Sequence, residues 1–176
     1  MKRLAIIGTL IALGMLLPAQ LAGASSHKSK HHKTKSKPKT TALATSCTVV
    51  TKAQAGAALG QTVTAGTLGH ATVEGGLACV FYGPNAPSTA DADVPVPDSV
   101  RVVLVTGSDA LKWFNDYKGK VQAQSIPGLG TQAYYDGDAS VSVLVGSEYL
   151  RVAVIGQTGV SEASEEQLAR DALPRM

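Results

Sequence analysis

The two cysteines of the chain, Cys47 and Cys79, are the first residues whose type and spacing point to chemistry. They lie on either side of a predicted short helix and the first predicted strands of the folded part. Thiols can act in redox reactions, but these two are far apart in sequence and no Cys-x-x-Cys motif is present. We therefore predict one structural disulfide, which closes the N-terminal third of the folded part into a loop.

Acid–base chemistry has few candidate residues. His70 is the only histidine of the folded part and lies in a glycine-flanked turn, and the chain contains no Gly-x-Ser-x-Gly motif. A pair of carboxylates could serve as general acid and base in a hydrolase. The loop aspartates that could form such a pair are Asp91, Asp93, Asp98, Asp136 and Asp138. Because exposed loop aspartates are usually solvated turn residues, a hydrolase is the alternative and not the favoured function.

Three further motifs lack residues that a phosphate or metal site needs. The turn at 127–130 has two glycines, but it lacks the lysine and Ser/Thr of a phosphate loop and leads into a predicted strand. Asp136-Gly137-Asp138 lacks the third ligand and the distal glutamate of an EF-hand loop, so we predict a hairpin turn. His31-His32 has neither cysteines nor a fixed scaffold beside it. The sequence therefore predicts no cofactor and no metal site.

Residues 1–24 have the pattern of a signal peptide. Met1-Lys2-Arg3 is basic, 4–17 is an apolar run of 14 residues, and Ala22 and Ala24 form an Ala-x-Ala cleavage pattern. A membrane-spanning helix needs roughly 20 apolar residues. We therefore expect cleavage after Ala24 and no transmembrane segment in the mature chain.

Residues 25–46 contain no aromatic side chain and are rich in Lys, His, Ser and Thr. Such a composition cannot bury enough apolar surface to offset the entropy of ordering, so we predict a disordered linker. The 16 basic residues divide into 2 in the leader, 6 in this linker and 8 from Thr40 onward, where all 13 acidic residues lie. The net charge is therefore +6 in the linker and −5 in the folded part.

The basic linker is either a soluble spacer or a means of electrostatic attachment to polyanions. Its lysines are Lys28, Lys30, Lys33, Lys35, Lys37 and Lys39. Each cation near an anionic membrane surface contributes on the order of 1 kcal/mol, and salt weakens the attraction. We expect residues 27–39 to bind anionic cell-envelope components, such as wall polymers or lipid head groups, rather than nucleic acid.

Residues 47–176 are long enough for one domain with a core. Thr51 and Gln54 predict a capping box, and Gly60 predicts the end of a helix over 52–59. A second helix is predicted over 109–118 with Ser108 as its cap, and a third over 162–173. Alternating or valine-rich runs predict strands at 61–67, 77–82, 99–106, 121–125, 131–136, 140–145 and 149–155.

This order of elements predicts an α+β fold. Short turns between successive strands favour a mostly antiparallel sheet of about six to seven strands with the helices on one face and one disulfide. In the second helix, Leu111, Phe114 and Tyr117 are expected to pack on the sheet with Trp113 at the edge. The alternative is that Trp113, Tyr117 and Tyr134 line a ligand pocket.

Several short stretches resemble the small secreted lipoproteins of actinobacteria, which are grouped under domains of unknown function. These stretches are Cys47 to Gly60, Cys79-Val80-Phe81-Tyr82, 127–130 with Ala133-Tyr134-Tyr135, the valine-rich hairpin, and 167–173. The resemblance implies an extracytoplasmic α+β domain with paired cysteines. Ala24 stands where the family has its lipidated cysteine. The lysine-rich linker could therefore replace the lipid as the anchor.

Together these observations predict a secreted, envelope-associated protein without catalytic activity. It would bind an apolar small ligand or an envelope protein. Besides the hydrolase, the alternative is a purely structural surface protein.

Overall fold

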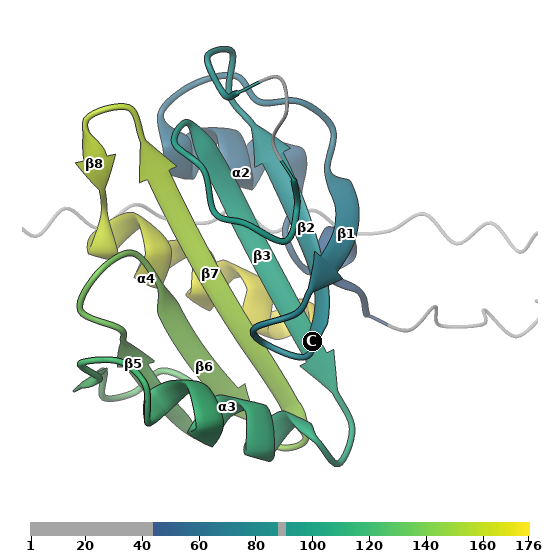
Figure 1. Cartoon of the computed structure of the whole chain (residues 1–176), viewed down its shortest axis with the longest axis vertical. Coiled ribbons are helices and arrows are strands. Elements are labelled where there is room, and N and C mark those ends of the chain that lie inside the picture. Colours follow the sequence, from purple (N-terminus) through teal and green to yellow (C-terminus); the bar gives the residue numbers. More distant parts are fainter. Residues whose placement is uncertain (1–43, 88–90) are drawn as a thin grey trace, which may run out of the picture. The chain divides into compact units, whose positions relative to one another are not determined.

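The computed structural model describes residues 44–87 and 91–176, which form one α+β domain built on a single antiparallel sheet (Figure 1). The leader and residues 25–43 of the predicted linker lie outside the described residues. Residues 44–46 are described, and Ser46 is buried and begins the first helix, so the predicted disordered linker does not extend to residue 46. The strands are β1 (Thr67–Ala71), β2 (Gly76–Tyr82), β3 (Ser99–Thr106), β4 (Gln124–Ser125), β5 (Gln132–Tyr135), β6 (Val141–Val145), β7 (Glu148–Gly156) and β8 (Gly159–Val160). Their order across the sheet is β1-β2-β3-β7-β6-β5-β4, and β8 pairs with β7.

Strands β3 and β7 form the centre of the sheet and are buried on both faces. Val100, Val102 and Leu104 of β3 point to one face, which we call the first face, and Val103 and Val105 point to the second. Continuous valine is what a strand covered on both sides requires. A sheet of this kind must therefore be covered on both faces.

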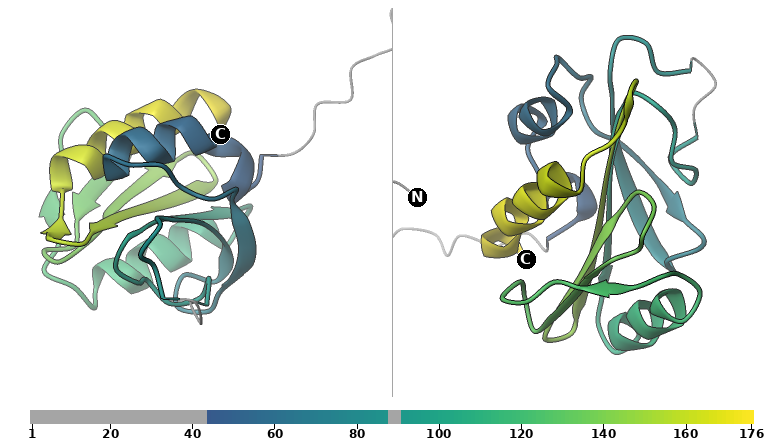
Figure 2. Two further views of the ribbon diagram at one scale, coloured as in Figure 1. Left: turned by 90° about the horizontal axis from the view of Figure 1, so that it is seen from above. Right: turned by 90° about the vertical axis from the view of Figure 1, so that its left-hand side faces the viewer.

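The helices provide this cover (Figure 2). On the first face lie α1 (Ser46–Val49), α2 (Lys52–Leu59) and α4 (Glu162–Ala172), which the 3₁₀ turn η1 (Leu173–Arg175) follows. On the second face lies α3 (Ala110–Lys118). The predicted α+β fold with one disulfide is confirmed, whereas the prediction that the helices gather on one face holds for three of the four helices. The remaining helix, α3, covers the valines on the second face of β3.

The disulfide joins α1 to β2. Cys47 and Cys79 are bonded, with 5.0 Å between their Cα atoms, and Cys79 is fully buried in the first-face core. Val49 and Val50, which follow Cys47, are buried in the same core. The bond therefore holds the first turn of the domain against the sheet.

Short-range signals predicted α2 well. The Thr51 hydroxyl accepts the Gln54 N–H at 3.2 Å, the Gln54 side chain accepts the Thr51 N–H at 3.0 Å, and Gly60 ends the helix with φ of 76°. The hairpin of β6 and β7 across 146–147 and the third helix are also found where they were predicted. None of the helices in the described ranges is long and apolar enough to cross a membrane.

The predicted strand at 61–67 is wrong, and β1 begins only at Thr67. Thr64 donates its N–H to Tyr82 at 2.8 Å, so this segment runs beside β2 without forming a regular ladder. At Gly66, a Cβ atom would come within 2.5 Å of the Cys79 sulfur. The close approach of Gly66 to the disulfide interrupts the segment 61–67, so its alternating pattern does not form a strand there.

The buried side of α3 also differs from the prediction. Leu111 is 49% exposed, and the helix begins at Ala110 without a side-chain cap from Ser108 or Asp109. Ala110 and Phe114 are fully buried, one helical turn apart, with Trp113 and Tyr117 beside them. A helix turns by about 100° per residue, so a stripe through Ala110, Phe114 and Tyr117 excludes Leu111.

Replacing both cysteines with alanine tests the contribution of the disulfide. The 32-residue separation predicts that the Cys47→Ala/Cys79→Ala variant loses about 3 to 4 kcal/mol of unfolding free energy, because the open chain gains entropy when unfolded. Urea denaturation of both proteins measures the difference. Reductant should bring the wild-type chain to the stability of the variant and leave the variant unchanged, and equal stability of the oxidised proteins would contradict the prediction.

Candidate functional site

Four charged side chains are buried together on the second face of the sheet. Glu74 comes from the turn between β1 and β2, Arg101 from β3, Arg151 from β7, and Asp136 from the residue after β5. Each is at most 9% exposed. Burying a charge is costly unless it is paired and hydrogen-bonded, so this constellation, which we call the buried charge cluster, is the principal candidate site.

Glu74 lies between the two arginines. Its carboxylate accepts hydrogen bonds from both terminal nitrogens of Arg101, at 2.8 and 3.2 Å, and a further one from Arg151 Nη1. Burial alone would raise the pKa of Glu74, but the hydrogen bond from Arg101 and the charges of Arg151 and Arg101 outweigh it and lower the pKa. Glu74 is therefore held as a carboxylate.

Asp136 pairs with the second terminal nitrogen of Arg151. Arg151 Nη2 lies 3.3 Å from Asp136 Oδ2, and Arg151 Nε donates to the Ser140 hydroxyl at 2.7 Å. Asp136 Oδ1 accepts backbone N–H groups from residues 138, 139 and 140 at 2.9 to 3.0 Å. Burial raises the pKa of Asp136, and the hydrogen bonds from Ser140 and these amides more than offset that effect. The net result is a lowered pKa.

Tyr117 of α3 completes the cluster. Its ring lies 4.0 Å from the Arg151 guanidinium, and its hydroxyl donates to Asp136 Oδ2 at 3.0 Å and accepts from Arg151 Nη2. Burial raises the pKa of Tyr117 to about 12. The cluster thus contains two guanidinium groups, two carboxylates and a neutral phenol, so its formal charge is zero.

The second face positions Glu74 by contacts on both sides of its turn. Trp113 packs over Gly75, where φ is +73° and a Cβ atom would come within 1.9 Å of the ring. On the other side, Asp93 accepts the Thr72 N–H at 2.6 Å and the Thr72 hydroxyl at 2.7 Å. The turn is therefore fixed by α3 and by the loop that follows β2.

Arg101 also holds that loop. Its Nε donates to the Ala92 carbonyl at 2.8 Å. At the end of the loop, Asp98 has a positive φ of 60° and its carboxylate accepts the Asn85 N–H at 2.7 Å and the Gln61 side chain. The loop between β2 and β3 is rich in proline and aspartate, and we call it the Pro/Asp loop. These contacts hold both ends of its described stretch 91–98.

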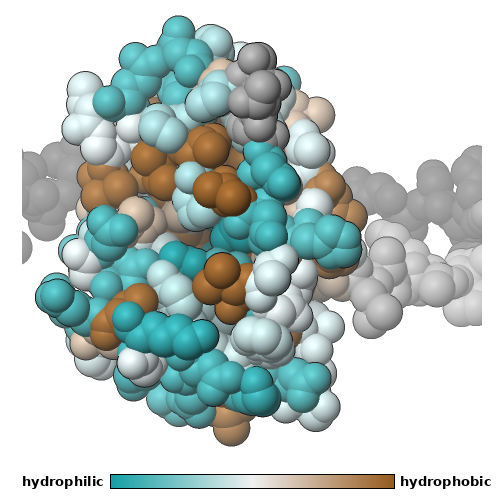
Figure 3. Space-filling model, in the orientation of Figure 1, coloured by the Kyte–Doolittle hydropathy of each residue, from teal (hydrophilic) through white to brown (hydrophobic). Residues whose placement is uncertain are grey.

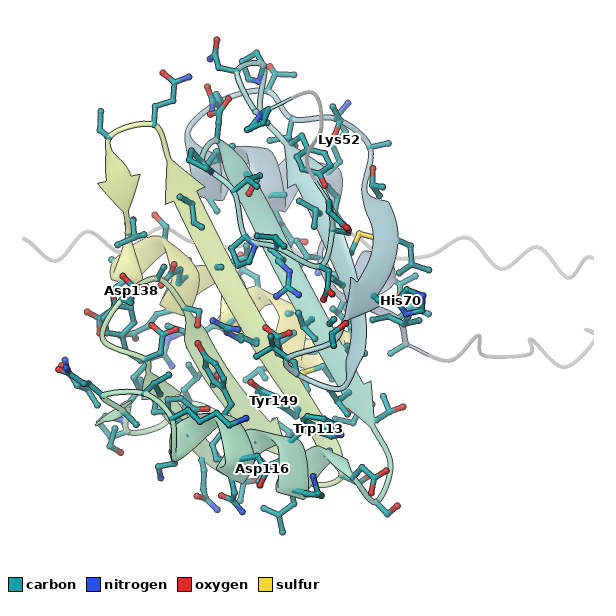
Figure 4. The ribbon with its side chains drawn as sticks, in the orientation of Figure 1. Lys52, His70, Trp113, Asp116, Asp138 and Tyr149 are labelled. Carbon is teal, nitrogen blue, oxygen red and sulfur yellow. A yellow bond between two sulfur atoms is a disulfide. The ribbon has the colours of Figure 1, made fainter. Side chains whose placement is uncertain are left out.

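The aspartates considered for acid–base chemistry thus act in hydrogen bonds that shape turns. Asp93 and Asp98 fix the loop, Asp91 accepts the Asp93 N–H at 3.0 Å, and Asp136 belongs to the buried charge cluster. His70 is exposed on β1 (Figure 4). The hydrogen bonds from Thr72 lower the pKa of Asp93, and the pKa of Asp136 is also lowered, so these two carboxylates are weak bases. The arrangement suits a structural tie better than proton transfer.

Trp113, Tyr117 and Tyr134 pack between α3 and the sheet. Tyr134 is fully buried, its ring centroid lies 5.0 Å from that of Phe114, and its hydroxyl donates to the Phe114 carbonyl at 3.2 Å. Trp113 covers Gly75 and Tyr117 stacks on Arg151. These positions match the core-packing alternative, and contact with a ligand stays a prediction. The lysines of residues 27–39 lie outside the described residues.

Sequence reasoning missed the buried charge cluster, although one signal was available. Arg101 and Arg151 each stand alone in a valine-rich run that predicts burial on both faces. A charged residue in such a strand needs a buried partner of opposite charge. Glu74 carried no such signal, because a glutamate beside Gly75-Gly76 is typical of an exposed turn.

A further buried carboxylate, that of Glu165, lies on the first face of the sheet, in α4. Glu165 is fully buried, its Oε1 accepts the Val154 N–H at 2.9 Å, and its Oε2 has no hydrogen-bond partner among the described residues. Burial raises the pKa of Glu165 to about 7, with smaller contributions from the charges of Asp136 and Glu162. Arg151 acts in the opposite direction but lies on the other face of the sheet. Glu165 thus differs from Glu74 in lacking a directly paired cation.

Comparisons of the chain with models of protein families, with curated proteins and with solved structures give no match. The function must therefore be argued from the residues themselves.

Replacing Glu74 with glutamine tests the buried charge cluster. Glu74→Gln leaves two buried arginines with one carboxylate between them, so we expect a loss of roughly 3 to 5 kcal/mol of unfolding free energy. The matched control is Glu166→Gln, which removes an exposed ion pair with Arg170 in α4 and should cost less than about 0.5 kcal/mol. Urea denaturation at pH 7 measures both variants, and similar losses in the two would contradict the structural role.

Glu165 predicts a pH dependence of stability. Its pKa is higher in the folded chain than the ordinary glutamate value of 4.5, so the folded state binds the proton more tightly and loses stability as the pH rises from about 4.5 through 7. Glu165→Gln cannot ionise. Between pH 5 and 8 the stability of this variant should gain on that of the wild type by roughly 2 to 3 kcal/mol.

Thermal and urea unfolding of both proteins across this range provide the measurement. Glu74 and Asp136 have lowered pKa values, so their effects on stability lie at lower pH. Parallel pH profiles for the two proteins would show that Glu165 does not ionise in this range.

Proposed function

We propose that this chain is a secreted, non-catalytic binding or accessory protein of the cell envelope, which attaches to anionic envelope components through residues 27–39. The separation of charge carries this proposal: the linker has a net charge of +6, and the rest of the chain from Thr40 has −5. A polycation that joins an acidic domain can bind an anionic surface while the domain is held away from it.

Two features of the domain support this function. Disulfides persist in oxidising compartments outside the cytosol, and the Cys47–Cys79 bond lies directly after the linker. The buried carboxylates Glu74 and Asp136 are paired with arginines, as a stable scaffold requires. The domain then serves as a rigid body that presents a surface.

An apolar ligand or a partner helix would fit the groove between α2 and α4. A cavity of about 330 Å³ lies there, lined by Ala57, Ala58, Ala163 and Leu168, with polar side chains such as Gln54 at the rim. Its volume is at the lower end of the roughly 300 to 1,000 Å³ typical of ligand pockets. On the opposite face, Figure 3 shows hydrophobic residues in the upper half of the view, and Val73 and Val94 are exposed by more than half. The groove is the better defined of the two surfaces.

Binding of the mature chain to anionic vesicles tests the attachment. Replacing Lys28, Lys30 and Lys33 with glutamine should weaken binding to phosphatidylglycerol vesicles roughly 100-fold at low salt, since each cation contributes on the order of 1 kcal/mol. Sedimentation of the vesicles at several salt concentrations gives the affinity, and high salt should release the wild-type chain.

The matched control removes the same charge from the domain. Lys112, Lys118 and Lys120 are exposed, and their replacement with glutamine should leave vesicle binding nearly unchanged. Equal weakening by both triple variants would place the binding surface on the domain. Binding that neither variant weakens would rule out electrostatic attachment.

A further inference from the structure

The edge of the sheet at β1 is open and uncharged. Within the part of the chain that the structure describes, β1 pairs with β2 alone. The stretch 61–73 along this edge contains no Lys, Arg, Asp, Glu or Pro. Natural edge strands usually carry such residues, or bulges, because an exposed strand edge pairs readily with another chain.

The other edge strands of the sheet are very short. β4 has two residues and ends the far side of the sheet, and β8 also has two residues and pairs with β7. In contrast, β1 has five residues, and Thr64 extends its contact with β2 by one further hydrogen bond. The β1 edge is therefore the longest edge of the sheet and the one least protected against pairing with another chain.

Apolar side chains accompany this edge. Leu68 lies opposite Cys79, and Leu77 lies opposite His70, so these side chains share the first face of the sheet. Leu68 is 53% exposed and Leu77 is 42% exposed, although both belong to the sheet. Figure 4 places His70 on the outer side of β1. A strand added at this edge would lie beside Leu68, whereas Leu77 lies one strand further in, on β2.

We propose that two copies of this chain associate by antiparallel pairing of β1 with β1. With Gly69 at the two-fold axis, Leu68 of one copy lies opposite His70 of the other. The two Leu68 side chains are then diagonal neighbours on one face of a continuous sheet. The strand is self-complementary because it brings only one ionisable residue type, His70, to the interface.

Charge and length favour a second copy over the chain's own linker. Within 28–39 the linker has a lysine at nearly every second position and no apolar side chain apart from Pro38, so this stretch offers little to cover Leu68. The chain after residue 24 has a net charge of +1, the sum of +6 and −5, so copies repel each other weakly. A single pair of short strands forms an interface below the roughly 1,200 Å² of stable complexes, which predicts a weak, concentration-dependent dimer.

Sedimentation velocity of the mature chain tests this proposal between about 5 and 500 µM, a range that covers weak association. The wild-type mass should rise toward twice the monomer mass with concentration, and Leu68→Lys and Thr67→Lys should each keep the chain monomeric. The matched control is Leu111→Lys, because Leu111 is a similarly exposed leucine on α3. This variant should dimerise as the wild type does. Circular dichroism confirms that each variant is folded.

Hydrogen exchange locates the contact. Amides of 67–71 should exchange more slowly at high than at low protein concentration, whereas amides of β4 at the opposite edge should not change. A wild-type chain that stays monomeric at all concentrations would overturn the proposal and leave the edge to a strand from another protein. Dimers that persist equally in both edge variants would also overturn it, and would place the contact elsewhere.

Discussion

The ion pair of Glu74 with Arg101 and Arg151 is the interaction on which the second face of the domain depends. Its origin is the burial of β3 and β7 on both faces, which places each of these arginines among valines and away from water. A buried guanidinium requires an anion with hydrogen bonds in good geometry. Glu74 meets this requirement for both arginines at once, and Asp136 supplies the remaining negative charge.

Several elements of the second face follow from this constraint. The turn between β1 and β2 must fold inward to bring Glu74 to the arginines, and Trp113 can lie against it only because residue 75 is a glycine. Arg101 then has a spare nitrogen that binds the Ala92 carbonyl, so the Pro/Asp loop is held over the sheet. The loop that composition alone marks as irregular and acidic is, in its described part, organised by a strand residue.

The sequence predicted those parts of the fold that local physics determines. Thr51, Gln54 and Gly60 specify a helix within ten residues, and the valine runs specify strands buried on both faces. The sequence did not predict those features whose structure depends on contacts between residues far apart in the chain. Glu74 is 27 residues from Arg101 and 77 from Arg151, so no window of sequence contains the cluster. Likewise, β1 is a glycine-containing strand with little intrinsic preference for the sheet, and its pairing with β2 makes it one.

Glu74 and Glu165 show how the environment and not the residue type decides the charge of a buried group. Both are fully buried, yet two arginines lower the pKa of Glu74, while burial raises that of Glu165, whose only described donor is a single backbone N–H. The domain therefore compensates its buried charges on one face and leaves one carboxylate uncompensated on the other. Since the paired charges are satisfied internally, they are not available to attract a partner. We therefore propose that recognition by this chain uses groups outside the buried charge cluster, namely the basic linker, the groove between α2 and α4, and the open edge of β1.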